Sequence, residues 1–195
     1  MAALTKSTQT ALLALQTVAA SSVVVGTGLN LPTQMGGIID VRFGREAATA
    51  AGAGVNIRLE QSQDNINWFP FAILTTNFAA CEGEAVSGTE AIGQTVIGAA
   101  STTNLTAGDI IFFFHGTIAN SEWHRIKSIV ASTSVTLEEA IVNAQTSSTM
   151  YDAAEIYSGI EVPAGALYVR AVADGSLFTQ AFAIQVLIST INTIA

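Results

Sequence analysis

The sequence predicts an all-β fold of the β-sandwich type, and alternating stretches carry this prediction. Apolar and polar residues alternate without a break over Val55–Glu60, and the same period of two returns at residues 39–43 and 182–188. A period of two places successive side chains on opposite faces of a strand, so each stretch is typical of a half-buried strand. Turn residues separate the stretches at short intervals, as expected of packed antiparallel sheets.

The clearest local prediction is a hairpin that begins with the strand at 55–62. Its next residues, Ser62-Gln63-Asp64-Asn65, have short polar side chains that bond their own backbone and favour chain reversal. The return strand then runs over Trp68–Leu74. We predict that Val55, Ile57 and Leu59 point into the core, because a slip of one residue would bury their polar neighbours instead.

Residues 1–22 are predicted to form an N-terminal arm or a short helix. Leu12, Leu15 and Val18 fall near helical spacing, which favours the helix. The apolar run resembles the core of a signal peptide, but Lys6 supplies its only positive charge and polar residues interrupt it. It also falls short of the roughly 20 apolar residues that a membrane span needs. We therefore expect a segment of the mature protein and no membrane contact.

The first sandwich block is predicted over residues 23–79. Its first strand lies at 23–25, and residues 29–32 form an edge segment because Pro32 lacks the N–H that a ladder requires. A strand at 39–43 follows. Residues 46–54 are almost all Ala, Gly and Thr, and they predict a loop able to approach another surface closely.

Residues 80–150 are predicted to be an inserted small β subdomain. The composition changes at residue 80, and residues 80–100 have no firm periodicity and indicate a connector. Three short strands follow, at 110–114, 123–128 and 134–138. This density of strands is typical of a small barrel or a β-ribbon.

The second sandwich block covers residues 151–195. A turn at 161–166 precedes a strand at 167–171, Asp174-Gly175 is a hairpin-type dipeptide, and the last strand lies at 182–188. Long alternation therefore resumes after the insertion. We expect the blocks at 23–79 and 151–195 to pair in one sheet system.

Charge is scarce in this chain of 195 residues. Half of the residues are hydrophobic and 11% are charged, against roughly 25% in an average domain. A well-packed protein with a neutral surface would fit, but we favour a surface covered by further copies or by a partner. The net charge is −8 and the seven Lys and Arg are scattered, so nucleic acid is not an expected partner. Cys81 is the only cysteine, which excludes an internal disulfide and indicates a small buried hydrophobe.

One set of residues has the chemistry of a metal site. His115, Glu122 and His124, with Asp109, carry proper ligands for a zinc-like ion. His124 alternates with Trp123 on a predicted strand, however, and His115 lies across a loop without ligand spacing. We therefore predict no metal and no other cofactor.

Catalytic motifs are also missing from the sequence. It contains neither a Gly-x-Ser-x-Gly elbow nor a phosphate-binding Gly-x-x-x-x-Gly-Lys motif. The carboxylate pairs Glu82/Glu84 and Glu138/Glu139 sit near turns, whereas a glycosidase needs two carboxyls across a cleft. We expect no catalytic residue and no enzyme.

The two tryptophans are candidates for contact with other molecules. Trp68 and Trp123 could stack on sugars, but such residues are more often core anchors or interface hot spots. The apolar terminal segments are also candidates for packing on a neighbour. The predicted interface residues are Leu12, Leu15, Trp68, Trp123, Ile191 and Ile194.

Several stretches, taken in their serial order, resemble tailed-bacteriophage virion structural proteins of the small decoration or cement type. They are Asp40–Arg45, Glu60–Asp64 with Trp68, Gly108–Ile111, Ser121–Trp123 with Arg125–Ile126, and Pro163–Arg170. The resemblance implies a jelly-roll-like sandwich on the capsid exterior. It also implies a non-enzymatic subunit that stabilises the head, with the major capsid protein and further copies of itself, as a homotrimer, for partners. A tail or baseplate component is the alternative within this group, and a carbohydrate- or receptor-binding module is the alternative outside it.

Overall fold

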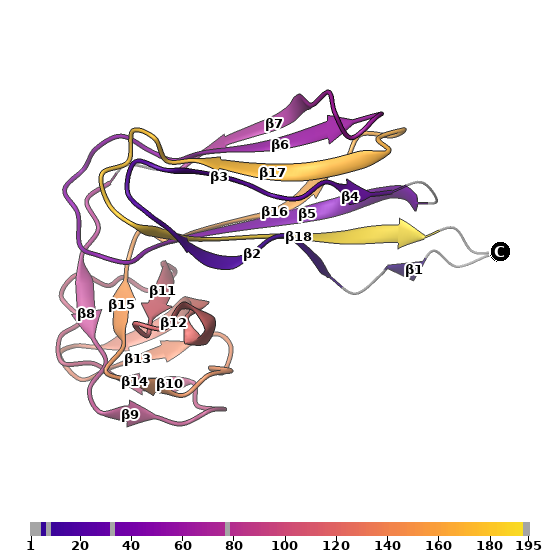
Figure 1. Ribbon diagram of the computed structural model, residues 1–195. Helices are drawn as coiled ribbons and strands as arrows, with labels where there is room; N and C mark the ends of the chain where they lie inside the picture. The colour runs from indigo at the N-terminus through magenta and orange to yellow at the C-terminus, as the bar shows by residue number, and fades with distance from the viewer. Residues whose placement is uncertain (1–4, 7–8, 32–33, 77–78, 193–195) are drawn as a thin grey trace.

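The computed structural model describes residues 5–6, 9–31, 34–76 and 79–192 (Figure 1). Within these residues the secondary structure is β throughout, apart from a 3-10 turn, η1, at Ile118–Asn120. Two sheets pack face to face as a sandwich, and a smaller group of strands lies beneath one end of it. The all-β sandwich predicted from the alternating stretches is confirmed.

Sheet A is the sandwich layer that faces the smaller unit. Its order is β1-β18-β5-β16, and β2 lies on the same edge of β18 as β1. All neighbours are antiparallel. The strands are β1 (Thr5–Lys6), β2 (Thr10–Val18), β5 (Gln34–Arg45), β16 (Glu155–Glu161) and β18 (Phe182–Asn192).

Sheet B is the other layer of the sandwich, and it is also antiparallel. Its order is β3-β17-β6-β7, and β4 continues the edge that β3 begins along β17. The strands are β3 (Val23–Val25), β4 (Leu29–Asn30), β6 (Asn56–Ser62), β7 (Phe69–Thr75) and β17 (Tyr168–Asp174).

The chain crosses between the two sheets in the manner of a jelly roll. After β2 it moves to sheet B for β3 and β4, returns to sheet A for β5, and crosses again for β6 and β7. The predicted hairpin at Asp174-Gly175 is wrong, because β17 belongs to sheet B and β18 to sheet A. This dipeptide starts a crossover instead.

The sandwich core lies between the inner faces of the two sheets. Val55, Ile57 and Leu59 are fully buried there, which confirms the direction predicted for the strand that carries them. They pack with alternate residues of β5 and β18, such as Phe43 and Phe182, whose rings lie 5.5 Å apart. Burial of this kind is the main stabilising contribution to such a fold.

The helix predicted near the N-terminus is wrong, because residues 10–18 form the edge strand β2. The ladder between β2 and β18 shifts register twice, near Val186. These irregularities let the adjacent residues Leu12 and Leu13 both be buried, at 4% exposed each. Two neighbouring buried leucines break the period of two, so the spacing of the apolar residues resembles that of a helix. The available edge of β18 decides in favour of a strand.

The small unit occupies the connection from β7 to β16, and its described residues form eight strands. Six of them form one antiparallel sheet in the order β10-β13-β12-β11-β15-β8, and β9 pairs with β14. The strands are β8 (Gly83–Ala85), β9 (Thr89–Glu90), β10 (Val96–Gly98), β11 (Ile110–Phe114), β12 (Glu122–Val130), β13 (Ser134–Leu137), β14 (Gln145–Thr146) and β15 (Thr149–Tyr151). It has its own buried cluster, which includes Ile97, Phe113 and Val135. We call this unit the insert.

The insert packs on the outer face of sheet A. Phe112 of β11 lies against the backbone of Gly44, where an added Cβ would come within 2.5 Å of the ring. Trp123 of β12 covers the same region, and its ring centroid is 4.7 Å from that of Phe112. Ala183 completes the contact from β18 and is fully buried. Only a residue without a side chain fits at position 44, so the junction depends on this glycine.

A second contact joins the insert to the loop after β5. Thr49 and Cys81 form an isolated antiparallel bridge, with backbone hydrogen bonds of 2.8 Å in both directions. Arg45, which is 1% exposed, bonds the Thr49 hydroxyl and the Ala79 carbonyl, and lies over the ring of Phe178. The Ala-rich loop predicted to approach another surface closely therefore approaches the chain's own insert.

Candidate interaction surface

The outer face of sheet B is open, because the insert covers sheet A instead (Figure 1). Its side chains lie in cross-strand rows fixed by the register. One row runs Val25, Val172, Arg58 and Ile73 across β3, β17, β6 and β7. Neighbouring rows carry Val23–Asp174–Asn56–Thr75 and Arg170–Glu60–Pro70. We call these residues the sheet-B face.

Charges lie in the centre of the sheet-B face and pair with one another. The Glu60 carboxylate, 7% exposed, receives Arg170 at 2.7 Å and Arg58 at 3.3 Å. Arg58 also contacts Asp174 at 3.3 Å. Two arginines and two carboxylates cancel, so the centre has no net charge although the chain carries −8.

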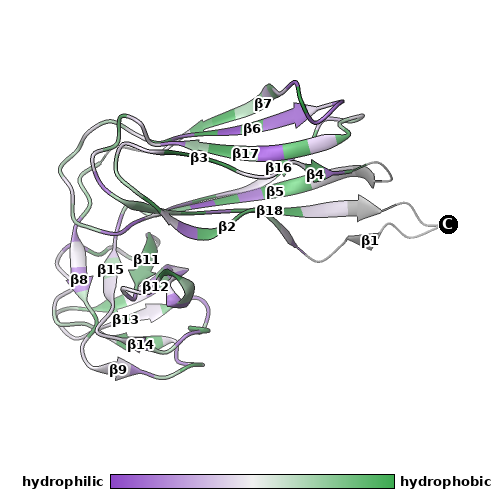
Figure 2. Cartoon of the chain, in the orientation of Figure 1, coloured by the Kyte–Doolittle hydropathy of each residue, from purple (hydrophilic) through white to green (hydrophobic). Residues whose placement is uncertain are grey.

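Apolar side chains flank this neutral centre on both edges. Val23 and Val25 of β3 are 50% and 53% exposed, and Ile73 of β7 is 60% exposed. Figure 2 shows the hydrophobic β7 beside the hydrophilic β6. Exposed apolar side chains grouped on one face are typical of a contact surface.

Trp68 lies at the end of this face and outside the sandwich core. The Arg170 guanidinium is 4.2 Å from its ring centroid, which is the geometry of a cation–π contact. On another side the ring lies against Gly28, where an added Cβ would be 2.8 Å away. The indole is half-buried, and Arg170 leaves little of its face for a sugar.

The other predicted interface residues have different positions. Trp123 is 8% exposed at the junction with the insert, and Leu12 is 4% exposed in the sandwich core. Leu15 is half-buried beside the insert. Ile191 lies in β18, opposite Gly36. Ile194 lies outside the described residues.

The structure does not assemble the candidate metal ligands. Glu122 and His124 bond each other at 2.9 Å, while Asp109 accepts a hydrogen bond from the Thr106 amide. His115 lies beyond the end of β11, and its Nδ1 is buried without a hydrogen-bond partner. Among the described residues, no three His, Cys, Asp or Glu side chains form a group that could hold an ion.

Glu122 is instead the centre of a hydrogen-bond network inside the insert. Its carboxylate accepts hydrogen bonds from His124, from the amides of Val142 and Asn143, and from Gln145 at 2.7 Å. Burial alone raises the pKa of Glu122, but these donors outweigh it and lower the pKa below the usual 4.5. The network ties β12 to the loop before β14, which is a structural role.

The other carboxylate pairs also have separate surroundings. Glu84 is 6% exposed and accepts hydrogen bonds from Ser101 and from Asn104, whereas Glu82 is exposed. Glu138 and Glu139 are both exposed, and Glu138 lies 3.8 Å from Arg125. Neither pair faces across a cleft as glycoside hydrolysis requires.

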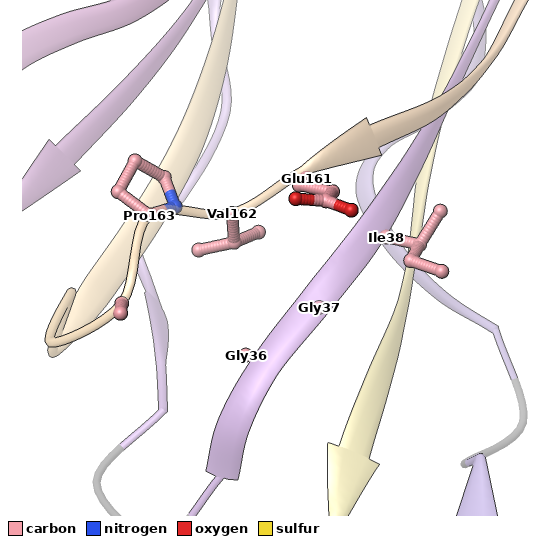
Figure 3. Close-up of a pocket in the computed structure, with 7 residues that line it drawn as sticks. Gly36, Gly37, Ile38, Glu161, Val162 and Pro163 are labelled. Carbon is pink, nitrogen blue, oxygen red and sulfur yellow. The ribbon is translucent and has the colours of Figure 1, made fainter.

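A cavity of about 490 Å³ lies at the end of the sandwich farther from the insert (Figure 3). The start of β5 and the end of β16 line it, where the Val162 amide bonds the Gly37 carbonyl at 2.9 Å. Glu161 is the only ionisable side chain among the lining residues. A single exposed carboxylate offers no partner for acid–base chemistry, so this cavity carries no functional assignment.

Neither a scan of protein-family models nor a search of curated proteins found a match to this chain. The described residues contain no helix long and apolar enough to cross a lipid bilayer. Among the surfaces described above, the sheet-B face combines exposed apolar side chains with fully paired charges.

Proposed function

We propose that the chain is a structural subunit of a bacteriophage particle, of the decoration or cement type, and that the sheet-B face is its main contact surface. The supporting observation is the pattern on that face, where Val23, Val25 and Ile73 flank a neutral charge network. Apolar edges around a satisfied polar centre suit burial against another protein, because no unpaired charge is desolvated. The resemblance to phage virion proteins supplies the biological setting.

Repetition would supply the binding strength of such a subunit. A single sheet face makes a modest contact, but the contacts of many copies arranged with the symmetry of a shell add up to strong binding. We propose a homotrimer that binds the major capsid protein on the capsid exterior. A tail or baseplate position remains the alternative within the same class.

The carbohydrate-binding alternative has less support than the contact surface. Trp123 is 8% exposed, and Arg170 already lies over the ring of Trp68. A sugar platform needs an open aromatic face beside hydrogen-bonding groups. Glycan-array binding by the purified protein would restore this alternative.

The proposal is tested with particles of the phage that encodes the chain. Purified protein is added to particles that lack it, and association is measured by cosedimentation and located by electron cryomicroscopy. We expect saturable binding on the head and an oligomer by light scattering. A stable monomer of 20.2 kDa that binds no part of the particle would contradict the proposal.

Matched variants locate the contact surface. Ile73→Asp introduces a charge on the sheet-B face, where Ile73 is 60% exposed, and we expect association to weaken about tenfold or more. Ile92→Asp makes the same change on the insert, where Ile92 is 67% exposed, and should leave association unchanged. Equal losses in both variants would exclude the sheet-B face as the specific contact.

A further inference from the structure

Two adjoining cavities lie between the insert and the outer face of sheet A. Their volumes are about 280 Å³ and about 270 Å³. Each lies just below the range of roughly 300–1,000 Å³ that is typical of sites for drug-sized ligands, and each has room for a single side chain. Both are lined by Arg42 of β5 and by Trp123, His124 and Glu139 of the insert.

Arg42 is the unexplained group in this crevice. Its Nε is buried and has no hydrogen-bond partner, and its guanidinium makes no ion pair with another described residue. An arginine removed from water normally pairs with a carboxylate or with carbonyl oxygens, because an unpaired buried donor is costly. Arg42 faces outward from sheet A, since its neighbours Val41 and Phe43 point into the core. Arg42 therefore lies on the side of sheet A that faces the insert, and it lines both cavities.

The other ionisable side chains around the crevice mostly have partners. His124, 7% exposed, bonds Glu122 at 2.9 Å, and Arg125 lies 3.8 Å from Glu138 at the rim. Glu139 is exposed and makes no ion pair among the described residues. It lines both cavities together with Arg42, so we expect it to be the main competitor for Arg42.

We propose that this crevice binds the carboxylate of an acidic side chain from another protein segment, with Arg42 as the cation. A planar guanidinium matches a planar carboxylate through two parallel hydrogen bonds. Trp123 and Ile156, which is 36% exposed, provide an apolar wall for the methylene groups that carry the carboxylate. The site does not depend on the proposed function, because the isolated chain can be tested for it.

The same surroundings select against a doubly charged anion. Glu138 and Glu139 line the crevice together with Arg42. These two carboxylates would repel a phosphate dianion more strongly than they would repel a monoanionic carboxylate. The site is thus distinguished from a phosphate site by charge and shape. Phosphate becomes one arm of the test.

The direct test follows the Nε–H signal of Arg42 by ¹H–¹⁵N NMR in the full-length chain. Sodium propionate, N-acetylglutamate N-methylamide, sodium phosphate and sodium chloride are titrated at matched ionic strength. We expect saturable shifts of the Arg42 signal with both carboxylates, and tighter binding of the glutamate derivative because it mimics a protein side chain. Tighter binding of phosphate, or equal shifts with chloride, overturns the proposal.

Three variants separate binding from structure. Arg42→Gln should weaken the binding of the glutamate derivative about tenfold or more. Arg125→Gln removes the same charge from the rim and should change binding by about twofold or less, because that arginine is exposed. Glu139→Gln removes the competing carboxylate and should strengthen binding about two- to fivefold. If Glu139→Gln instead abolishes binding and lowers the thermal midpoint, Arg42 and Glu139 form a structural pair and the proposal fails.

Discussion

The indole Nε1 of Trp123 donates a 2.9 Å hydrogen bond to the backbone carbonyl of Phe43. The donor belongs to the insert and the acceptor to β5, a central strand of sheet A, so one bond joins two residues that are 80 positions apart in the chain. A buried tryptophan usually finds such a partner for its polar end. This bond fixes the orientation of the insert on the sandwich.

We expect Trp123→Phe to destabilise the protein by about 1–3 kcal/mol, because the ring packing is largely kept while the hydrogen bond is lost. Trp68→Phe is the control, since the indole of Trp68 is half-buried and donates no hydrogen bond among the described residues. We expect this variant to lose about 1 kcal/mol of stability. Urea unfolding measures both. Equal losses would show that the bond to Phe43 contributes nothing specific.

The contact between Gly44 and Phe112 gives a second prediction. Gly44→Ala places a Cβ 2.5 Å from the Phe112 ring, and we expect a loss of about 1–3 kcal/mol from overpacking. Gly52→Ala is the control, because the nearest atom to its added Cβ is 3.9 Å away. That variant should be neutral, or more stable by about 0.4–1 kcal/mol. Unchanged thermal unfolding of Gly44→Ala would contradict the close packing at this junction.

The Glu122 network predicts a dependence of stability on pH. The folded pKa of Glu122 lies below the usual 4.5, so its contribution is complete above pH 4.5 and is lost as the pH falls through the lower folded value. We expect Glu122→Gln to cost about 1–3 kcal/mol at pH 7, because the carboxylate then no longer accepts from its donors. The stability difference from wild type should shrink below pH 4.5. Denaturant midpoints from pH 7 to pH 3 test this, and a constant difference would count against it.

The reactivity of the Cys81 thiol should report on opening of the contact between the insert and the loop after β5. Burial, and then the nearby Asp152 carboxylate, raise the pKa of its thiol to about 12, so the thiolate is scarce at pH 8. The native protein should react with a thiol reagent such as DTNB only through opening of the junction, and the unfolded protein should react at once. Fast stoichiometric labelling of the native protein would contradict this burial. The Arg42→Gln and Trp123→Phe variants can be compared by the same assay.

The sandwich could be predicted from the sequence where burial follows a period of two. The strand after Val55 and the strand of β18 keep this alternation, and both were correctly expected. The N-terminal strand could not be predicted, because irregular pairing with β18 buries the adjacent Leu12 and Leu13. The strand β16 was missed for a related reason: it lies at an edge, where all of its side chains are exposed or half-buried.

The contact surface was predictable only in part. The scarcity of charge indicated an interface, but the rows of the sheet-B face depend on register between strands that are distant in sequence, such as Val25 with Val172. The role of Trp123 depends on packing between the insert and Gly44, which no local pattern reveals. The position of Arg42 could not be predicted either, because an outward arginine on a strand is normally solvated, and the burial of its Nε depends on residues that are distant in the sequence.

The position of β18 has a consequence for how the protein is made. This strand lies between β2 and β5 in sheet A, so it pairs with segments that leave the ribosome more than 130 residues earlier. Until residues 182–192 emerge, β2 has no strand to pair with, and sheet A lacks the strand that joins β2 to β5. The apolar strand β2 of a nascent chain therefore stays unpaired until β18 is synthesised. A product truncated before residue 182 cannot complete sheet A. Completion of sheet A therefore requires synthesis through β18.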